Sequence, residues 1–136
     1  MTPFKIEFLD HVAIRVANLE VSSKWYGKVL GLRKYKMEKW GDFPIFLLSG
    51  KTGIALFPKI KESSQLPADS KKHKIDHFAF NVTKENFIKA RRRYEELGLD
   101  FEIQDHHYFH SMYTKDPDGY TVELTTIVVQ EEDFYK

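Results

Sequence analysis

Apolar and polar residues follow the same short pattern at two places in the chain. Residues 10–16 read Asp-His-Val-Ala-Ile-Arg-Val, and residues 76–82 read Asp-His-Phe-Ala-Phe-Asn-Val. The residue types keep one order in both segments, and the offset between them is 66 residues. The β-branched and aromatic side chains predict a β-strand at each place. The match indicates an internal repeat, so we expect two copies of one structural unit.

Each of these strands is followed by apolar residues at helical spacing. Asn18 and Thr83 are candidate N-caps, because their side-chain oxygens can accept hydrogen bonds from the first free N–H groups of a helix. The helical patterns end at Gly31 and Gly98, which lie 67 residues apart in matching Leu-Gly-Leu triplets. Glycine suits the left-handed conformation that closes many helices. One helix is therefore expected between residues 18 and 31, and another between residues 83 and 98.

Three shorter strand-like runs follow each glycine. They cover residues 34–39, 43–49 and 53–58 in the first half, and residues 100–104, 108–114 and 120–128 in the second half. Each half therefore predicts the element order βαβββ.

A polar connector without periodicity separates the two halves. It carries serines and lysines and predicts no regular element. The Asp-Pro-Asp-Gly sequence at residues 116–119 is a tight-turn signal between the last two strands. We expect one domain over residues 1–136, made of a first module at 6–58, a connector at 59–74, a second module at 75–128 and a charged tail at 129–136.

Composition then narrows the functional classes. The chain has 136 residues, 42% hydrophobic and 30% charged, which is typical of a globular protein. Its 21 Lys and Arg against 20 Asp and Glu give a net charge of only +1, which disfavours a general nucleic-acid binder. There is no apolar run of about 18 residues and no signal-peptide pattern, so we expect a cytoplasmic protein with no membrane partner. Cysteine is absent, so a metal site must use His, Asp or Glu.

Three such residues stand out on the predicted strands. His11 and His77 occupy the same position in the two repeated segments. Glu123 is a lone carboxylate in a β-branched and apolar run, and a buried carboxylate is costly unless it is paired or binds a cation. If the two modules are related by a pseudo-twofold axis, these three side chains converge. An offset of 67 residues pairs Glu123 with Leu56, which cannot bind a metal.

On these residues the chain resembles the vicinal oxygen chelate superfamily, which includes glyoxalase I, extradiol dioxygenases and fosfomycin-modifying thiol transferases. The resemblance covers roughly residues 6–128. It rests on Asp10-His11-Val12-Ala13, Trp25-Tyr26-Gly27-Lys28-Val29-Leu30-Gly31, Asp76-His77-Phe78-Ala79 and Asp116-Pro117-Asp118-Gly119-Tyr120-Thr121-Val122-Glu123-Leu124. It implies an α+β fold in which the two βαβββ modules form a curved, mostly antiparallel β-surface around a metal ion.

The resemblance also implies a ligand set. The equivalent family positions are His11, Leu56, His77 and Glu123, of which Leu56 departs from the four-ligand pattern of glyoxalase I. Two histidines and one carboxylate resemble instead the extradiol dioxygenases and the fosfomycin thiol transferases. Three ligands leave three neighbouring positions open on an octahedral ion, enough for a substrate that binds through two oxygens. Fe, Mn, Zn, Ni and Co all suit these donors, and the sequence does not choose among them.

Tyr113 and His107 are the candidate catalytic residues. Family members often carry a site-facing tyrosine at the position of Tyr113, which could hydrogen-bond an oxygen held at the metal. By strand alternation His107 shares the face of Tyr113, and a neutral imidazole can act as general acid or base on a catecholic hydroxyl. Solvated positions are the competing interpretation for His106, His107 and His110, and the roles of His106 and His110 stay open.

The leading hypothesis is a divalent-metal enzyme acting on a small molecule with two neighbouring oxygens, as extradiol dioxygenases do. The alternatives are a glyoxalase-like lyase or isomerase, a thiol transferase at the same metal, and a ligand-sequestering protein like the bleomycin-resistance members. Compact two-module relatives typically dimerise, so we expect a homodimer. Its site lies either within one chain or across the dimer interface.

Overall fold

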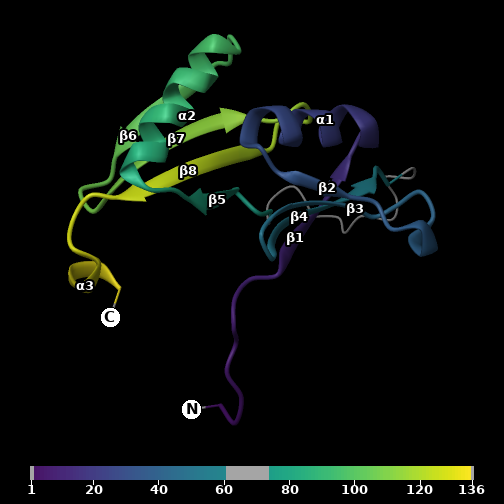
Figure 1. The fold of residues 1–136 in the computed structure, drawn as a ribbon, viewed down its shortest axis with the longest axis horizontal. Coiled ribbons are helices and arrows are strands. Elements are labelled where there is room, and N and C mark those ends of the chain that lie inside the picture. Colours follow the sequence, from purple (N-terminus) through teal and green to yellow (C-terminus); the bar gives the residue numbers. More distant parts are fainter. Residues whose placement is uncertain (1, 61–73, 136) are drawn as a thin grey trace. The chain divides into compact units, whose positions relative to one another are not determined.

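The computed structural model describes residues 2–60 and 74–135 and shows an α+β fold (Figure 1). The chain divides into two compact units, residues 1–67 and 68–136. Each unit contains one of the expected modules and one four-stranded sheet. The two tandem modules are therefore confirmed. Most of the expected connector, residues 61–73, lies outside the described residues, and the extent of a single domain stays a prediction.

The first unit builds its sheet from four strands and covers it with one helix. In chain order the elements are β1 (His11–Val16), α1 (Leu19–Leu30), β2 (Arg33–Tyr35), the 3-10 helix η1 (Glu38–Trp40), β3 (Ile45–Ser49) and β4 (Thr52–Pro58). The strand order is β1-β4-β3-β2, in which β1 and β4 are parallel and the other pairs are antiparallel. Helix α1 packs on β3 and β4.

The second unit repeats this arrangement. Its elements are β5 (His77–Asn81), α2 (Lys84–Glu96), β6 (Phe101–Asp105), β7 (Phe109–Lys115), β8 (Thr121–Ile127) and the short helix α3 (Glu131–Phe134). The strand order β5-β8-β7-β6 is that of the first sheet, and again only the pair that β5 forms is parallel. Helix α2 packs on β8. The sequence repeat is therefore a repeat of structure.

The helices begin and end where the sequence predicts. The side chain of Asn18 accepts a hydrogen bond of 3.0 Å from the N–H of Val21, and that of Thr83 accepts one of 3.1 Å from the N–H of Asn86. Gly31 follows α1 with φ of 68°, a left-handed conformation that costs glycine little. These local signals set the entry of each helix after the strand that carries a candidate ligand.

Alternation along the central strands separates a core face from an open face. On β8, Val122, Leu124 and Thr126 are buried toward the helix side, and they belong with Met112 and Tyr94 to the core of the second unit. The intervening residues of β8 project to the opposite face. Helix α2 covers one face of the sheet, so the other face is left for a site.

Two expected elements differ in the structure. The second strand is shorter than residues 34–39, because the chain turns into η1 after Tyr35. The tail at residues 129–136 is more than a charged extension, because α3 places Phe134 on Phe109 with ring centroids 4.7 Å apart. The charged composition of the tail does not predict this aromatic contact, which packs the C-terminal segment on β7.

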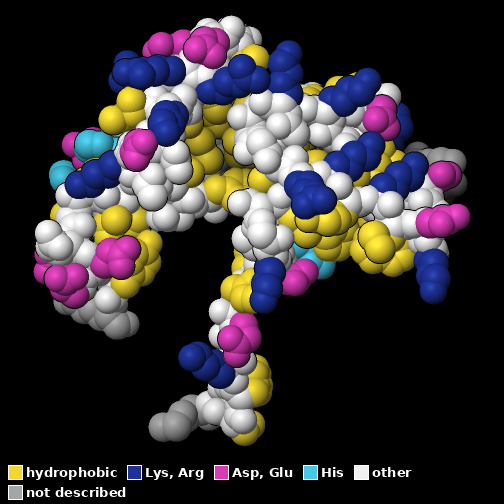
Figure 2. Space-filling view, in the orientation of Figure 1, with side chains coloured by type: hydrophobic (Ala, Val, Ile, Leu, Met, Phe, Trp, Pro, Cys, Tyr) yellow, Lys and Arg dark blue, Asp and Glu magenta, His cyan; other side chains and the backbone are white. Residues whose placement is uncertain are grey.

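The N-terminal segment carries exposed apolar side chains, seen as yellow atoms along the extended stretch near the N-terminus (Figure 2). Phe4, Ile6 and Leu9 are 67%, 75% and 69% exposed. Contiguous apolar surface of this kind marks association sites in soluble proteins. Within residues 2–60 and 74–135, no helix has the length and apolar character needed to cross a bilayer.

Tyr94 provides a test of the core of the second unit. Its side chain is 1% exposed, and among the described residues its hydroxyl has no hydrogen-bond partner, while burial raises its pKa above the usual value. We expect Tyr94→Phe to raise the free energy of unfolding by about 1–3 kcal/mol, because an unpaired buried hydroxyl is removed. Urea denaturation measures the change.

Tyr94→Leu is the matched control for that substitution. It removes the hydroxyl and also the ring contact with Phe101, whose centroid lies 5.7 Å away. This variant is expected to lose stability. A Tyr94→Phe protein that is less stable than the parent would contradict the assignment of an unsatisfied hydroxyl.

Candidate active site

One face of the second sheet carries the candidate site. In the sheet register, Glu123 of β8 lies between Ala79 of β5 and Tyr113 of β7, and Glu102 of β6 lies next to Tyr113. Paired residues on neighbouring strands project to the same face. The adjoining row on that face holds His77, Thr121 and Lys115. We call this surface the site face.

His77 and Glu123 lie together on the site face. The Nε2 atom of His77 is 3.1 Å from Oε1 of Glu123, and Nδ1 of His77 is 2.8 Å from Oδ2 of Asp76. When Nδ1 donates to a carboxylate, the ring is held with its lone pair on Nε2, the arrangement that metal-binding histidines usually have. Two donors bound to one ion at about 2.1 Å lie about 3 Å apart. The pair therefore fits two positions on a divalent ion.

The Glu123 carboxylate is buried, and few groups around it compensate its negative charge. Its side chain is only 9% exposed, and Ser111 donates a hydrogen bond of 2.9 Å to Oε2. Ser111 is also 3.0 Å from the hydroxyl of Thr125. Among the described residues, no Lys or Arg forms an ion pair with this carboxylate. His77 is its basic neighbour, and a buried carboxylate is costly unless a cation compensates its charge, as a metal ion bound beside His77 would.

Tyr113 joins a histidine to this pair. Its ring stands edge-on to that of His77, with centroids 5.9 Å apart, and its hydroxyl is 2.9 Å from Nε2 of His106. Burial and the negative charge of Glu123 both raise the pKa of the Tyr113 hydroxyl. Tyr113 is therefore held as a protonated phenol between a histidine and the candidate ligands.

The structure brings His106, and not His107, to Tyr113. His107 lies in the turn between β6 and β7 with φ of 70°, and its backbone N–H donates to Oδ1 of Asp105 over 2.8 Å. Strand alternation stops at this turn, so counting back from Tyr113 assigns the wrong parity to its residues. His110 is exposed, with Nε2 3.8 Å from Asp105, on the other face of β7. The sequence signal that could have found His106 is the break in strand alternation at the turn between β6 and β7.

The first unit keeps only part of this arrangement. His11 has its Nδ1 2.7 Å from Oδ2 of Asp10, as His77 has with Asp76, and its ring lies 4.9 Å from that of Phe46. The register places Ala55 between Ala13 and Phe46. In the second unit Glu123 lies between Ala79 and Tyr113 in the same way. The first unit therefore offers one histidine as a ligand.

That register corrects the expected pairing of Glu123 with Leu56. The residue equivalent to Glu123 is Ala55, one position earlier. Leu56 projects to the opposite face and is fully buried. A uniform offset of 67 fails here because the loop between β7 and β8 is longer than the one between β3 and β4. Neither Ala55 nor Leu56 can bind a metal, so the conclusion of a missing fourth ligand is unchanged.

Within the described residues, no group of three or more His, Cys, Asp or Glu side chains is close enough to hold a metal. His77 and Glu123 are the two expected ligands that one unit brings together. His11, the third, belongs to the other unit.

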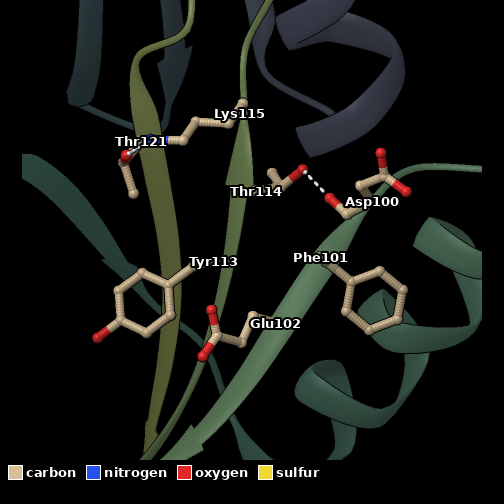
Figure 3. Close-up of a pocket in the computed structure, with 7 residues that line it drawn as sticks. All are labelled: Asp100, Phe101, Glu102, Tyr113, Thr114, Lys115 and Thr121. Atoms are coloured by element: carbon tan, nitrogen blue, oxygen red, sulfur yellow. Dashed lines mark hydrogen bonds between the residues drawn. The ribbon is translucent and has the colours of Figure 1, made fainter.

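A pocket lies over β6, β7 and the start of β8 in the second sheet (Figure 3). Its volume is about 310 Å³. The residues that line it are Asp100, Phe101, Glu102, Tyr113, Thr114, Lys115 and Thr121. Tyr113 and Thr121 connect it to Glu123 and His77 through the sheet register. A small molecule bound at the ligand pair could extend into this space.

Comparison with known proteins identifies relatives of the same fold. The family model described as the Glyoxalase/Bleomycin resistance protein/Dioxygenase superfamily matches residues 8–124. The glutathione transferase FosA of Serratia marcescens is 27% identical over 88% of this chain and 80% of its own length. The metallothiol transferase FosB of Staphylococcus epidermidis is 26% identical over 97% of this chain and 91% of its own length. A crystal structure of a glyoxalase/dioxygenase from Nostoc punctiforme superposes with a TM-score of 0.75 at 20% identity, covering 95% of this chain and 97% of that one.

Proposed function

This chain belongs to the Glyoxalase/Bleomycin resistance protein/Dioxygenase superfamily, and on that premise we propose that it is a divalent-metal enzyme that oxygenates a small substrate with two neighbouring hydroxyl groups. One observation carries the proposal. The His106–Tyr113 pair, joined by a hydrogen bond of 2.9 Å, lies against the His77–Glu123 pair. Proton-transfer groups beside candidate metal ligands are what the cleavage of a diol requires.

His77 and Glu123 are the proposed ligands from the second unit, and His11 is the proposed third ligand. His11 and His77 occupy equivalent strand positions, and an aspartate holds Nδ1 in both. When bound, a divalent ion of Fe, Mn, Zn, Ni or Co supplies Lewis acidity and orients the two substrate oxygens. The hydrogen bond from Ser111 fixes the Glu123 carboxylate for that role.

The residues of the chain handle the protons. We assign to Tyr113 a hydrogen bond to the substrate oxygen that lies nearest His77. His106 is the general base and then the general acid, because its Nε2 is within hydrogen-bonding distance of the Tyr113 hydroxyl. In this scheme His106 takes the place that alternation gave to His107. Tyr113 then passes a proton between the substrate hydroxyl and His106.

Thiol transfer at the same metal is the second candidate. It is favoured by the similarity to FosA and FosB, which extends over 80% and 91% of their lengths. Fosfomycin carries a phosphonate, yet the segment after Glu123 contains no basic residue before Lys136. We therefore rank oxygenation first.

Metal analysis combined with oxygen uptake separates these candidates. Protein purified without chelator or affinity tag is expected to contain iron or manganese and to consume oxygen when catechols are added. Zinc or nickel with no oxygen uptake, and transfer of a thiol to an epoxide, would support the second candidate instead. Protein that takes up none of the five ions would contradict both and leave a ligand-sequestering protein.

We also propose a homodimer, supported by the exposed apolar side chains of the N-terminal segment. Co-expression of His11→Ala and Glu123→Ala chains tests whether His11 serves the partner. With a shared site, about a quarter of the sites regain all three ligands, since each mixed dimer contains one intact set. With a site inside one chain, none does. Sedimentation of a monomer holding stoichiometric metal would exclude the shared site.

A further inference from the structure

The pocket beside the ligand pair has walls of opposite charge. Its volume is about 310 Å³, and its lining includes the acidic side chains Asp100 and Glu102 and the basic side chain Lys115 (Figure 3). Asp100 directly precedes β6 and Glu102 lies within it, whereas Lys115 ends β7. Among the described residues, the two acids of the pocket form no ion pair with Lys115, while the positive charge of Lys115 also acts on Asp76, the partner of His77.

Lys115 presents its ammonium group on the side of the candidate ligands. Its Nζ donates to the hydroxyl of Thr121, and in Figure 3 the side chain runs toward Thr121 and away from Asp100. Thr121 is the register partner of His77 on the neighbouring strand. The ammonium thus lies in the row of His77, on the β8 side of the pocket.

The acids occupy the other side of the same pocket. Glu102 lies opposite Tyr113 in the register and is held by a hydrogen bond of 3.1 Å from the side-chain amide of Gln104. Two strand spacings, about 10 Å, separate it from Glu123. A substrate bound at the ligand pair with an arm of a few bonds would reach between Lys115 and Glu102.

We propose that this pocket binds a free α-amino acid group on the substrate. The α-carboxylate pairs with Lys115, and the α-ammonium pairs with Glu102, with Asp100 adding negative potential. An arm with only one charge would pair with the residue of opposite charge on one side of the pocket and would be repelled by the residue of like charge on the other side. A zwitterionic arm satisfies both, so the pocket selects it by charge complementarity.

The proposal rests on the proposed function, because the bearer of the arm is anchored at the candidate metal ligands. Two kinds of candidate substrate carry this group, an aromatic diol with an amino-acid side chain and an amino-acid thiol. The first suits oxygenation and the second suits thiol transfer. Two matched ligand series therefore test the pocket and the chemistry separately.

Equilibrium binding under anaerobic conditions, measured by calorimetry on the metal-loaded protein, provides the readout. The diol series is 4-methylcatechol, 3,4-dihydroxyphenylacetate, dopamine and L-DOPA, which share the diol and carry a neutral, an anionic, a cationic and a zwitterionic arm of one to three heavy-atom bonds. L-DOPA is expected to bind about 10-fold more tightly than any of the other three. The thiol series is L-cysteine, cysteamine and 3-mercaptopropionate, in which L-cysteine is expected to lead if thiols are the substrates.

Two single-charge variants locate the effect. Lys115→Gln is expected to weaken L-DOPA and 3,4-dihydroxyphenylacetate about 10-fold while leaving dopamine and 4-methylcatechol unchanged. Glu102→Gln is expected to weaken L-DOPA and dopamine and to leave the other two. Metal content of both variants should equal that of the parent, since neither residue is a proposed ligand.

The outcomes separate the two proposals. Equal binding of all four diols, together with oxygenation of 4-methylcatechol, would overturn the pocket proposal and keep the oxygenase. No diol binding, with preference for L-cysteine that Lys115→Gln removes, would keep the pocket and overturn the oxygenase. Ligand preferences that neither substitution alters would also overturn the pocket proposal.

Discussion

Glu123→Ala and His77→Ala are each expected to weaken metal binding by about 100-fold or more while the protein stays folded. Each removes one of two donors that lie 3.1 Å apart and share a place on the site face. Loss of groups that merely support a ligand already costs 10- to 100-fold, so the loss of a ligand itself sets that range as the minimum. Metal content after dialysis and titration with a competing chelator measure the effect.

His110→Ala is the matched control for these variants. His110 lies on β7, as Tyr113 does, but it projects to the other face and is exposed. This variant should retain the metal content of the parent. Equal metal occupancy in all three proteins would refute the ligand assignment, because removal of a real ligand and of an exposed histidine cannot have the same result.

The apoprotein provides a second readout for Glu123. Without metal, its buried carboxylate has Ser111 and His77 as partners but no Lys or Arg among the described residues. Glu123→Gln keeps an acceptor for Ser111 and removes the buried negative charge. The apoprotein of this variant is expected to unfold at the same or higher urea concentration than the parent, although it binds metal poorly. A stability loss without a loss of metal would indicate a structural carboxylate.

Much of the fold could be predicted because the same sequence pattern occurs in both halves of the chain. The repeated Asp-His strands, the caps at Asn18 and Thr83 and the glycine after α1 are local signals, and each acts within a few residues. Their agreement in both halves specifies the element order. The strand faces then follow from alternation, which puts Ser111 and Tyr113 on one face of β7.

The parts that failed depend on turns, where the two-residue period of a strand no longer applies. The pairing of Glu123 with Leu56 was wrong by one residue because loop lengths differ between the units, and a slip of one residue reverses the face. The positive φ of His107 breaks the count in the same way. The packing of Phe134 on Phe109 joins two distant segments and has no local signal.

The two units differ where the proposed chemistry lies. The rows equivalent in the two sheets read Ala13, Ala55 and Phe46 in the first unit, and Ala79, Glu123 and Tyr113 in the second. The two rows have the same backbone arrangement, but only the row of the second unit contains a carboxylate and a phenol. The duplicated fold thus supplies two equivalent histidines, and the second unit supplies the groups that would act on a substrate.

His106→Gln is expected to lower kcat for diol oxygenation by about 10²- to 10⁴-fold, the usual contribution of a positioned general acid or base. The adjacent His107→Gln is expected to leave kcat unchanged. The two residues are neighbours in the chain, but only His106 contacts the Tyr113 hydroxyl, at 2.9 Å. His107 has left-handed backbone geometry, so its replacement by asparagine, which tolerates that conformation, should be measured as well.

Steady-state kinetics must be combined with two further measurements to assign the role. If His106 moves a proton, metal content and the anaerobic dissociation constant of the diol should stay near those of the parent while kcat falls. Tyr113→Phe should lower kcat with unchanged metal content and also weaken diol binding, because it removes the hydrogen bond to the substrate oxygen. The double variant should be little slower than either single variant, because the two residues act as one unit. A fall in kcat for His107→Gln and His107→Asn that equals the fall for His106→Gln would overturn the assignment. It would return the catalytic role to the residue that strand alternation favours.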